Sequence, residues 1–345
     1  MTTSAAKEHT LSGFLGMIGC AATAMVIGLL WLVALGCAAW STGALYYDFP
    51  IAKSAAAWAF LLTLIGALLF LRESWRKLGA IFAAFLIVLA WWLTLKPSNE
   101  RKWQSDVAKT AYAEINGDLV TLHNVRNFDY LTSSEYTPRW EMRTVRLSSI
   151  TGMDLFINYW GSPWIAHPIV SFQFADAPPL CFSIETRRRV GQEYSAIGGL
   201  YRQFELIYIV SDERDVIRVR TNYRKGEDLY LYHMLSTPAQ ARNRFQQYLS
   251  SINQLHDQAR WYNAITANCT TAIRQQSPSG ERMPWDWRLL INGKGDELMF
   301  ERHTIATGGL PFAELKKRAR INPAALEANN AWDFSARIRA GRPGF

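Results

Sequence analysis

The sequence has none of the common signatures of a metal site, a nucleotide site or a serine hydrolase. Its 345 residues contain no HExxH or CxxC pattern, no glycine-rich phosphate loop and no GxSxG elbow. Four histidines also lack the spacing of metal ligands: His123, His233, His256 and His303. We therefore expect no metal and no cofactor, and a function that side chains perform by themselves.

Cysteine is scarce. Four cysteines are too few for a disulfide framework, and Cys20 and Cys37 lie in an apolar run where we expect them to be small hydrophobic fillers. Cys181 and Cys269 remain. A structural bridge between these two is one alternative, because an oxidising compartment would permit it.

Clustered positive charge is missing as well. The net charge is +8, but Lys and Arg are scattered, and no basic stretch with interleaved aromatic residues resembles a nucleic-acid groove. We therefore expect no nucleic-acid partner. In a membrane protein, an excess of Lys and Arg fits attraction to anionic lipid near the surface.

Long apolar runs are concentrated in the first hundred residues. Residues 11–40, 55–71 and 78–95 are each long enough to cross a bilayer. The first run is too long for a signal peptide and lacks a clear small-residue cleavage site. The sequence therefore predicts a membrane module over residues 1–100, with three transmembrane helices, and an extramembrane domain over residues 101–345.

Charges in the short loops predict the orientation. Residues 72–77 carry three positive charges, whereas residues 41–54 carry one Lys and one Asp. The positive-inside rule places the basic loop and the N-terminus in the cytoplasm. Three crossings then place everything after Lys96 outside, in a periplasm-like space. If the short second helix did not cross, the domain would lie on the other side.

The extramembrane part shows the period-two alternation of strands, enriched in β-branched and aromatic residues. We expect strands at residues 119–126, 144–150, 169–174, 180–184, 205–210 and 216–221. Helices are expected at residues 238–257, 311–319 and 323–328 and after Cys269, with an extended basic strap at residues 337–345. The predicted fold class is α+β, with helices packed against a mainly antiparallel sheet.

Cys269 is the strongest candidate for chemistry. Asn268 is a good helix N-cap, and residues 270–274 fit a first helical turn. Peptide dipoles at a helix start stabilise a thiolate, which makes a thiol nucleophilic near neutral pH. Such a thiol needs a base, and His167, far upstream, is the best candidate.

A predicted hairpin brings a carboxylate towards His167. Ser183 and Glu185 share one side of the strand that follows the tight link at residues 175–179. Antiparallel pairing across that link would place Glu185 near the imidazole, as the orienting member of a triad. In the alternative interpretation, His167 is structural and Glu185 pairs with the arginines at positions 187–189.

These residues together would perform acyl chemistry. The thiolate attacks an acyl carbon, and the histidine takes the thiol proton and later returns it to the leaving group. The backbone N–H of Cys269 would stabilise the oxyanion, and Asn268 or Tyr262 would add side-chain donors. Asn268-Cys-Thr270 also fits a glycosylation sequon, but the rest of the chain looks bacterial.

Several separated motifs point to one family. They are Trp164-Ile-Ala-His167 with Ser171-Phe172, Phe182-Ser-Ile-Glu-Thr-Arg-Arg-Arg189, Gln203-Phe-Glu-Leu-Ile-Tyr208, Tyr262-Asn263, Asn268-Cys-Thr-Thr271 and Phe334-Ser-Ala-Arg-Ile-Arg339. Together they resemble the bacterial Lnb family from Leu119 to the C-terminus. The resemblance implies an extracytoplasmic, papain-like thiol fold of the permuted NlpC type, in which the histidine precedes the cysteine.

The resemblance also implies a thiol acyltransferase at the outer face of the inner membrane. Lnb enzymes move an acyl chain from the glyceryl lipid of a lipoprotein to its N-terminal cysteine amine. Cys269 would be the acyl-accepting nucleophile and His167 its base, acting on a lipoprotein or phospholipid beside membrane lipid. Two other classes stay open, because fold resemblance does not determine the reaction: a cell-envelope thiol amidohydrolase or peptidase, and a non-enzymatic membrane scaffold.

Overall fold

The structure is a computed structural model that describes residues 3–266, 286–289 and 292–345. It divides into two compact units. The first contains Met1–Lys96 together with the tripeptide Tyr201–Gln203. The second contains Pro97–Leu200 and Phe204–Phe345.

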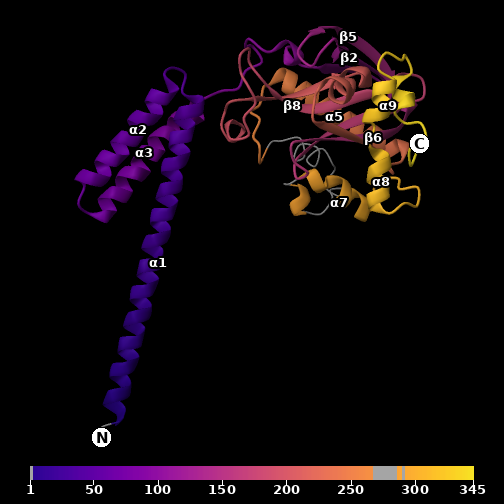
Figure 1. The fold of residues 1–345 in the computed structure, drawn as a ribbon. Helices are drawn as coiled ribbons and strands as arrows, with labels where there is room; N and C mark the ends of the chain where they lie inside the picture. Colours follow the sequence, from indigo (N-terminus) through magenta and orange to yellow (C-terminus); the bar gives the residue numbers. More distant parts are fainter. Residues whose placement is uncertain (1–2, 267–285, 290–291) are drawn as a thin grey trace. The chain divides into compact units, whose positions relative to one another are not determined.

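Three helices make up most of the first unit: α1 (Thr3–Asp48), α2 (Lys53–Phe70) and α3 (Ser74–Thr94) (Figure 1). By length and composition, each contains a stretch that is able to cross a membrane, which confirms the three predicted transmembrane helices. α1 continues beyond its predicted end at residue 40. It stops shortly before Pro50, because the helical conformation is unfavourable for the residue that precedes a proline.

Buried side chains hold the three helices together. One cluster takes a residue from each helix: Ala34, Leu64 and Ile81. Near the ends of α1 and α3, the Asp48 carboxylate accepts hydrogen bonds from the Trp92 indole N–H at 2.7 Å and from the Arg202 backbone N–H at 3.0 Å. These bonds fix the tripeptide Tyr201–Gln203 to the helix ends as part of the first unit.

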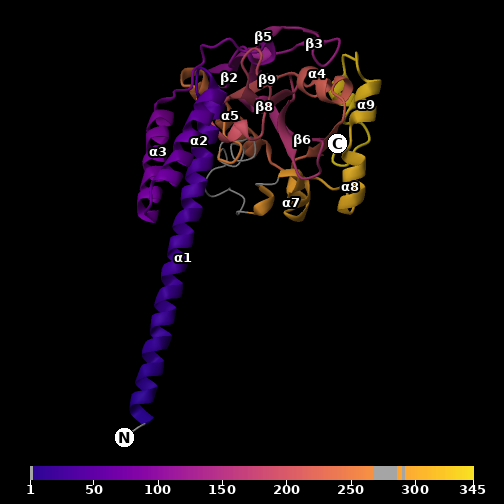
Figure 2. The same cartoon turned by 60° about the vertical axis from the view of Figure 1, so that its left-hand side comes forward.

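The second unit is built on an eight-stranded, mainly antiparallel sheet (Figure 2). The strand order is β1-β2-β9-β8-β7-β6-β10, and β5 pairs with β2. The strands are β1 (Tyr112–Asn116), β2 (Leu119–Arg126), β5 (Trp140–Arg146), β6 (Ile150–Trp160), β7 (Ala166–Phe174), β8 (Leu180–Arg187), β9 (Glu205–Ser211) and β10 (Glu227–His233). A separate hairpin joins β3 (Asp129–Tyr130) to β4 (Tyr136–Thr137). With the helices, this arrangement confirms the α+β class.

Four of the predicted strands are confirmed, in β2, β7, β8 and β9. The strand predicted at residues 144–150 joins the end of β5 to the start of β6. In the structure the 3-10 helix η2 (Leu147–Ser149) separates these two strands.

The strand predicted at residues 216–221 is wrong. This segment is helical, in α4 (Glu213–Val216) and the π-helix η4 (Val219–Tyr223). Its β-branched residues match strand propensity, but Asp212 caps α4 by accepting the N–H of Arg214 at 2.8 Å. Val216 and Ile217 are buried in a core cluster, so tertiary packing overrides propensity here.

The helices expected in the described residues are present. α5 (Pro238–Asp257) has a capping box at Thr237, and α8 (Phe312–Ala319) and α9 (Asn322–Glu327) match the two short helices. The predicted extended strap is wrong, because α10 (Phe334–Arg337) leads into turns. The helix expected after Cys269 lies outside the described residues. Within the described ranges, the remaining helices are η1 (Ser105–Val107), η3 (Gly198–Leu200), η5 (Trp287–Leu289), η6 (Asn292–Lys294) and α7 (Gly295–Glu301).

The sheet has two different faces in its centre. On the face we call apolar, Phe172 and Phe182 meet Phe245 and Tyr248 of α5 in edge-to-face contacts with ring centroids 5.0–5.8 Å apart. The opposite, polar face is made by the alternate residues of the same strands. There Ile169 packs with residues of α4, α9 and α10, while buried polar side chains lie beside this smaller core. The candidate site lies on the polar face.

Candidate active site

His167 and Glu185 meet across neighbouring strands. β7 and β8 pair antiparallel with Ile169 opposite Ser183. Continuing this register by two residues places His167 opposite Glu185 on the polar face. His167 Nε2 lies 3.2 Å from Glu185 Oε1. The approach that the predicted hairpin required is therefore present.

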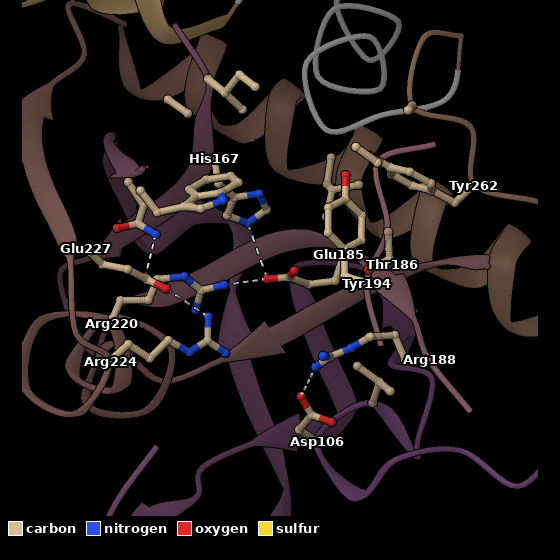
Figure 3. Close-up of a pocket in the computed structure, with 18 of the residues that line it drawn as sticks. Asp106, His167, Glu185, Thr186, Arg188, Tyr194, Arg220, Arg224, Glu227 and Tyr262 are labelled. Carbon is tan, nitrogen blue, oxygen red and sulfur yellow. Dashed lines mark hydrogen bonds and ion pairs between the residues drawn. The ribbon is translucent and has the colours of Figure 1, made fainter. Parts of the chain in front are cut away.

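Ser183 lies between the imidazole and the carboxylate. Its Oγ is 2.8 Å from His167 Nε2 and donates to Glu185 Oε1 at 2.6 Å. Arg220 Nη2 donates to the same carboxylate oxygen at 2.6 Å (Figure 3). Because the Ser183 proton is directed at Glu185, the Ser183 oxygen is able to accept an N–H from His167. A neutral ring that carries its proton on Nε2 satisfies this network, and the lone pair of that tautomer is on Nδ1.

The Glu185 carboxylate stays ionised in this setting. Burial alone would raise the pKa of Glu185, but the charges of His167 and Arg220 and the hydrogen bonds from His167 and Ser183 hold that pKa well below its ordinary value. Burial lowers the pKa of Arg220, and the nearby Glu185 charge opposes this change. The site therefore holds a fixed anion beside an imidazole, which is an arrangement that stabilises an imidazolium.

Arg220 reaches the site from the π-helix η4. Its side chain is buried, and Nη1 donates to the backbone oxygen of Val216 at 2.8 Å, which directs Nη2 towards Glu185. Sequence reasoning missed this residue because it assigned the segment to a strand. Ser183 was placed on the correct strand face, two residues before Glu185, but was given no role.

A cavity of about 400 Å³ lies next to this cluster (Figure 3). Its wall comes from β6, β7 and β8, from η4, and from the segment before β9. Besides His167 and Glu185, the residues that line it include Asn158, Trp160, Arg188, Tyr194, Arg224 and Tyr262. The cavity is large enough for part of a small-molecule substrate.

The chain that precedes Cys269 reaches this cavity. Tyr262 and Ala264 both line it. The backbone N–H of Tyr262 donates to the oxygen of Phe204 at 2.9 Å, and that of Ala264 donates to Gly199 at 2.8 Å. These two bonds hold the segment beside the start of β9.

The chain that follows Cys269 reaches the same cavity. Asn292 lines it, and its Oδ1 accepts the backbone N–H of Ala166, the neighbour of His167, at 2.8 Å. The N–H of Gly293 donates to the oxygen of Trp164 at 3.0 Å. Only glycine fits this approach, because a Cβ at position 293 would lie 2.3 Å from the carbonyl carbon of Trp164.

The structure brings together some of the predicted site residues. His167 and Glu185 are in contact, and Tyr262 lies in the wall of the same cavity. Cys269 and Asn268 lie outside the described residues, so their roles stay predictions. Cys181 is a free, fully buried cysteine, so the alternative of a bridge to Cys269 is wrong.

The arginines at and after the end of β8 do not supply the charge partner that the structure records for Glu185. Arg187 donates to the backbone oxygens of Val107 at 2.9 Å and Ala108 at 2.7 Å, and Arg188 pairs with Asp106 at 3.3 Å. The alternative in which Glu185 pairs with this run is corrected to Arg220. Arg187 instead holds the chain that enters the domain.

Three membrane-crossing helices and an extramembrane sheet define a membrane-anchored protein with one α+β domain. Residues 136–293 match the family described as the Lnb N-terminal periplasmic domain. The match confirms the resemblance: the protein is a membrane protein that carries an Lnb-type periplasmic domain. The matched range includes His167, Glu185 and Cys269. No curated protein and no solved structure shows a significant match to the chain.

Proposed function

We propose that this protein is a cysteine-dependent acyltransferase of the bacterial inner membrane, with Cys269 as nucleophile and His167 as base. Its substrates are acyl chains of a lipoprotein or phospholipid at the outer face of that membrane, and its domain is papain-like. One observation carries the proposal. A buried imidazole, oriented by Ser183 and Glu185, lines the same cavity as the chain on both sides of Cys269.

The hydrogen bonds of His167 support the role of a base. With the proton held on Nε2, the lone pair lies on Nδ1, which is the nitrogen that would receive the thiol proton. The resulting imidazolium is stabilised by Glu185, whose charge is maintained by Arg220. Glu185 is then the orienting member of the catalytic set.

Chain length supports a position for Cys269 near the cavity. Cys269 is five positions beyond Ala264, which lines the cavity. Since each residue extends a chain by at most about 3.6 Å, the two Cα atoms lie within about 18 Å of each other. Tyr262, which also lines the cavity, would donate its hydroxyl proton to the oxyanion.

The reaction proceeds through a thioester. His167 takes the proton of the Cys269 thiol, and the thiolate attacks the carbonyl carbon of a glyceryl ester. The C–S bond forms, the C–O bond breaks, and the imidazolium proton passes to the departing glyceryl oxygen. An acceptor amine then attacks the thioester: the C–N bond forms, the C–S bond breaks, and one amine proton returns through His167 to the sulfur.

An apolar part of the cavity wall supports an acyl substrate. Trp160, Ile165 and Tyr194 line the cavity, with 41%, 54% and 47% of their surfaces exposed. Exposed apolar side chains beside a cavity are typical of a site for an apolar ligand. The chain also carries three helices able to cross a membrane, so membrane lipid is an apolar ligand that this protein meets.

The test is intact-protein mass spectrometry of the full-length protein in detergent, mixed with phospholipid and a diacylglyceryl lipopeptide. We expect an adduct of one acyl chain that hydroxylamine removes, as a thioester requires. Cys269→Ala abolishes the adduct. The matched control Cys37→Ala, which removes a free cysteine of α1, retains it.

An adduct of unchanged yield in Cys269→Ala would contradict the proposal. Release of peptide fragments from peptidoglycan, without any acyl adduct, would instead favour the thiol amidohydrolase. A thiol that reacts with a lipid-like probe at the same rate in the parent and in His167→Ala would favour the non-enzymatic scaffold.

A further inference from the structure

We propose that the cavity contains a phosphate subsite formed by Arg224 and Arg188, and that the acyl donor is a glycerophospholipid. The uncharged glyceryl lipid of a lipoprotein has no group for such a subsite. This inference rests on the proposed acyl transfer and specifies its donor.

Arg224 has a loosely held guanidinium in the cavity wall. The charge partner recorded for it within the described residues is Glu227, with an Nη1–Oε1 distance of 3.6 Å, which is too long for a hydrogen bond. Glu227 has a closer partner in Asn158, whose amide donates to it at 2.6 Å. About a third of the Arg224 side chain is exposed. Its N–H groups are therefore available to an anion that enters the cavity.

Arg188 offers a second guanidinium. Its Nη2 lies 3.3 Å from Asp106 Oδ2, and its side chain is 30% exposed. In the view of Figure 3, Arg224 and Arg188 both lie below Glu185, whereas His167 lies above it. A phosphate held by these arginines would leave the side of the cavity next to His167 for the ester that reacts.

Two buried polar atoms in the same wall lack partners. Arg220 and Asn158 are 3% and 2% exposed and line the cavity. Within the residues that the structure describes, Arg220 Nε and Asn158 Oδ1 form no hydrogen bond. A buried polar atom without a partner is destabilising. Because both atoms are shielded from solvent, they add to the polar character of this wall, and the exposed Arg224 and Arg188 would make the contacts with a phosphate.

The cavity is amphipathic as a whole. Arg224 and Arg188 provide a cationic wall, and Trp160, Ile165 and Tyr194 provide an apolar one. A planar guanidinium forms paired hydrogen bonds with phosphate oxygens, which favours a phosphodiester over a neutral glyceride. A glycerophospholipid carries the phosphate and the acyl ester on one glycerol unit, so one molecule is able to contact both walls.

The first test measures binding without turnover. Dihexanoylphosphatidylglycerol is titrated into full-length Cys269→Ala protein in detergent by calorimetry, with dihexanoylglycerol and inorganic phosphate as the other ligands. We expect the phospholipid to bind at least tenfold more tightly than either one. Arg224→Gln or Arg188→Gln lowers its affinity about tenfold, which is about 1.4 kcal/mol. The matched control Arg320→Gln, which removes an exposed arginine paired with Asp228 outside the cavity, leaves the affinity unchanged.

Several results would overturn the subsite. The first is that Arg224→Gln and Arg188→Gln bind the phospholipid as tightly as the starting Cys269→Ala protein does. The second is that the neutral glyceride binds as tightly as the phospholipid. The third is that inorganic phosphate binds as tightly as the phospholipid. The last result would assign the cavity to a free anion. An unchanged Tm of both variants shows that they remain folded.

The second test separates this inference from the proposed function, using thioester formation on Cys269 in the parent and in Arg224→Gln. Arginine-dependent lipid binding without any thioester would support the subsite and contradict the acyltransferase. Thioester formed equally from phospholipid and neutral glyceride, in both proteins, would support the acyltransferase and contradict the subsite.

Discussion

The two faces of the central sheet are made by alternate residues of the same strands, yet different interactions hold them. On the apolar face, Phe182 contacts Phe172, Phe245 and Tyr248. The hydrophobic burial in such contacts is non-directional, so several neighbours share the stabilisation. On the polar face, each buried charge needs a partner in a fixed place, as Glu185 needs Arg220. The apolar face therefore stabilises the fold, and the polar face positions the chemistry.

The C-terminal segment shows the same requirement on the polar face. Arg339 donates to Asp154 at 3.0 Å and to Glu213 at 2.6 Å, and both carboxylates are fully buried. The tail was expected to be a strap, but it supplies the counter-ion for Asp154 in the middle of β6 and for Glu213 at the start of α4. The pairing of these buried carboxylates on the polar face therefore depends on a residue from a distant part of the chain.

The strongest contrast should come from His167→Ala. Removal of a general base costs on the order of 10³-fold, or about 4 kcal/mol, in the rate of thioester formation. Glu185 keeps Arg220 as its partner, so we expect Tm to change by less than about 3 °C. Thioester mass spectrometry and a thermal melt of the same sample measure the two effects. If the rate and the Tm both fell strongly, a residue of the polar face would also be needed for stability, which would contradict the different roles of the two faces.

The converse variant is Phe182→Ala on the apolar face. Truncating a fully buried phenylalanine costs about 3–4 kcal/mol of unfolding free energy, which lowers Tm by about 10 °C. Thioester formation well below the melting range should stay within about twofold of the parent, because no site residue is removed. The exposed Ile115→Ala is the control and should hardly change Tm. A lost activity at unchanged Tm would contradict the expectation.

Ser183→Ala should give a smaller effect that sharpens the comparison. It removes the hydroxyl between His167 and Glu185, and one such hydrogen bond contributes about 1–2 kcal/mol, so we expect about a tenfold slower thioester formation. Ser211→Ala removes a buried hydroxyl that has no hydrogen-bond partner within the described residues. That control should not slow the reaction. Equal rates for the two variants would remove Ser183 from the catalytic set.

The smallest expected effect is the pH-dependent contribution of His233 to the stability of the domain. The hydrogen bond with Asp154 raises the pKa of His233, against the effect of burial. The stabilisation is therefore complete below the ordinary histidine pKa of about 6.5 and is lost as pH rises through the raised value. Because a third of the side chain is exposed, the effect is below about 1 kcal/mol. His233→Gln should reduce the difference in Tm between about pH 6 and pH 8. If that difference were unchanged, another titrating group would be responsible for the pH dependence of stability.

The sequence predicts those parts of the fold in which apolar residues gather on one face and more polar residues on the other. β2, β7, β8 and α5 have clear periodicity, because each presents apolar residues to one side. β6 was missed because it presents apolar residues to both faces, Leu155 and Ile157 to one core cluster and Phe156 to another, so no alternation marks it. The segment of Arg220 has strand-like composition and is helical only through its tertiary packing.

The same limits apply to the site. The pairing of His167 with Glu185 follows from a short hairpin, whose register is a local property of the sequence. Arg220 and Asn292 reach the site through long-range contacts, and no local pattern in the sequence reports these. Local geometry was therefore predictable, whereas the partners from distant segments were not.

Gly293 has a consequence for how this domain is able to vary. A methyl group at that position would collide with the backbone between Pro163 and Ile165, and backbone, unlike a side chain, cannot rotate aside. Any other residue would displace η6 from this backbone and break the hydrogen bond between the Ala166 N–H and the Asn292 side chain. The absence of a side chain at Gly293 therefore allows the segment Asn292–Gly293, downstream of Cys269, to pack closely against the start of β7, the strand that contains His167.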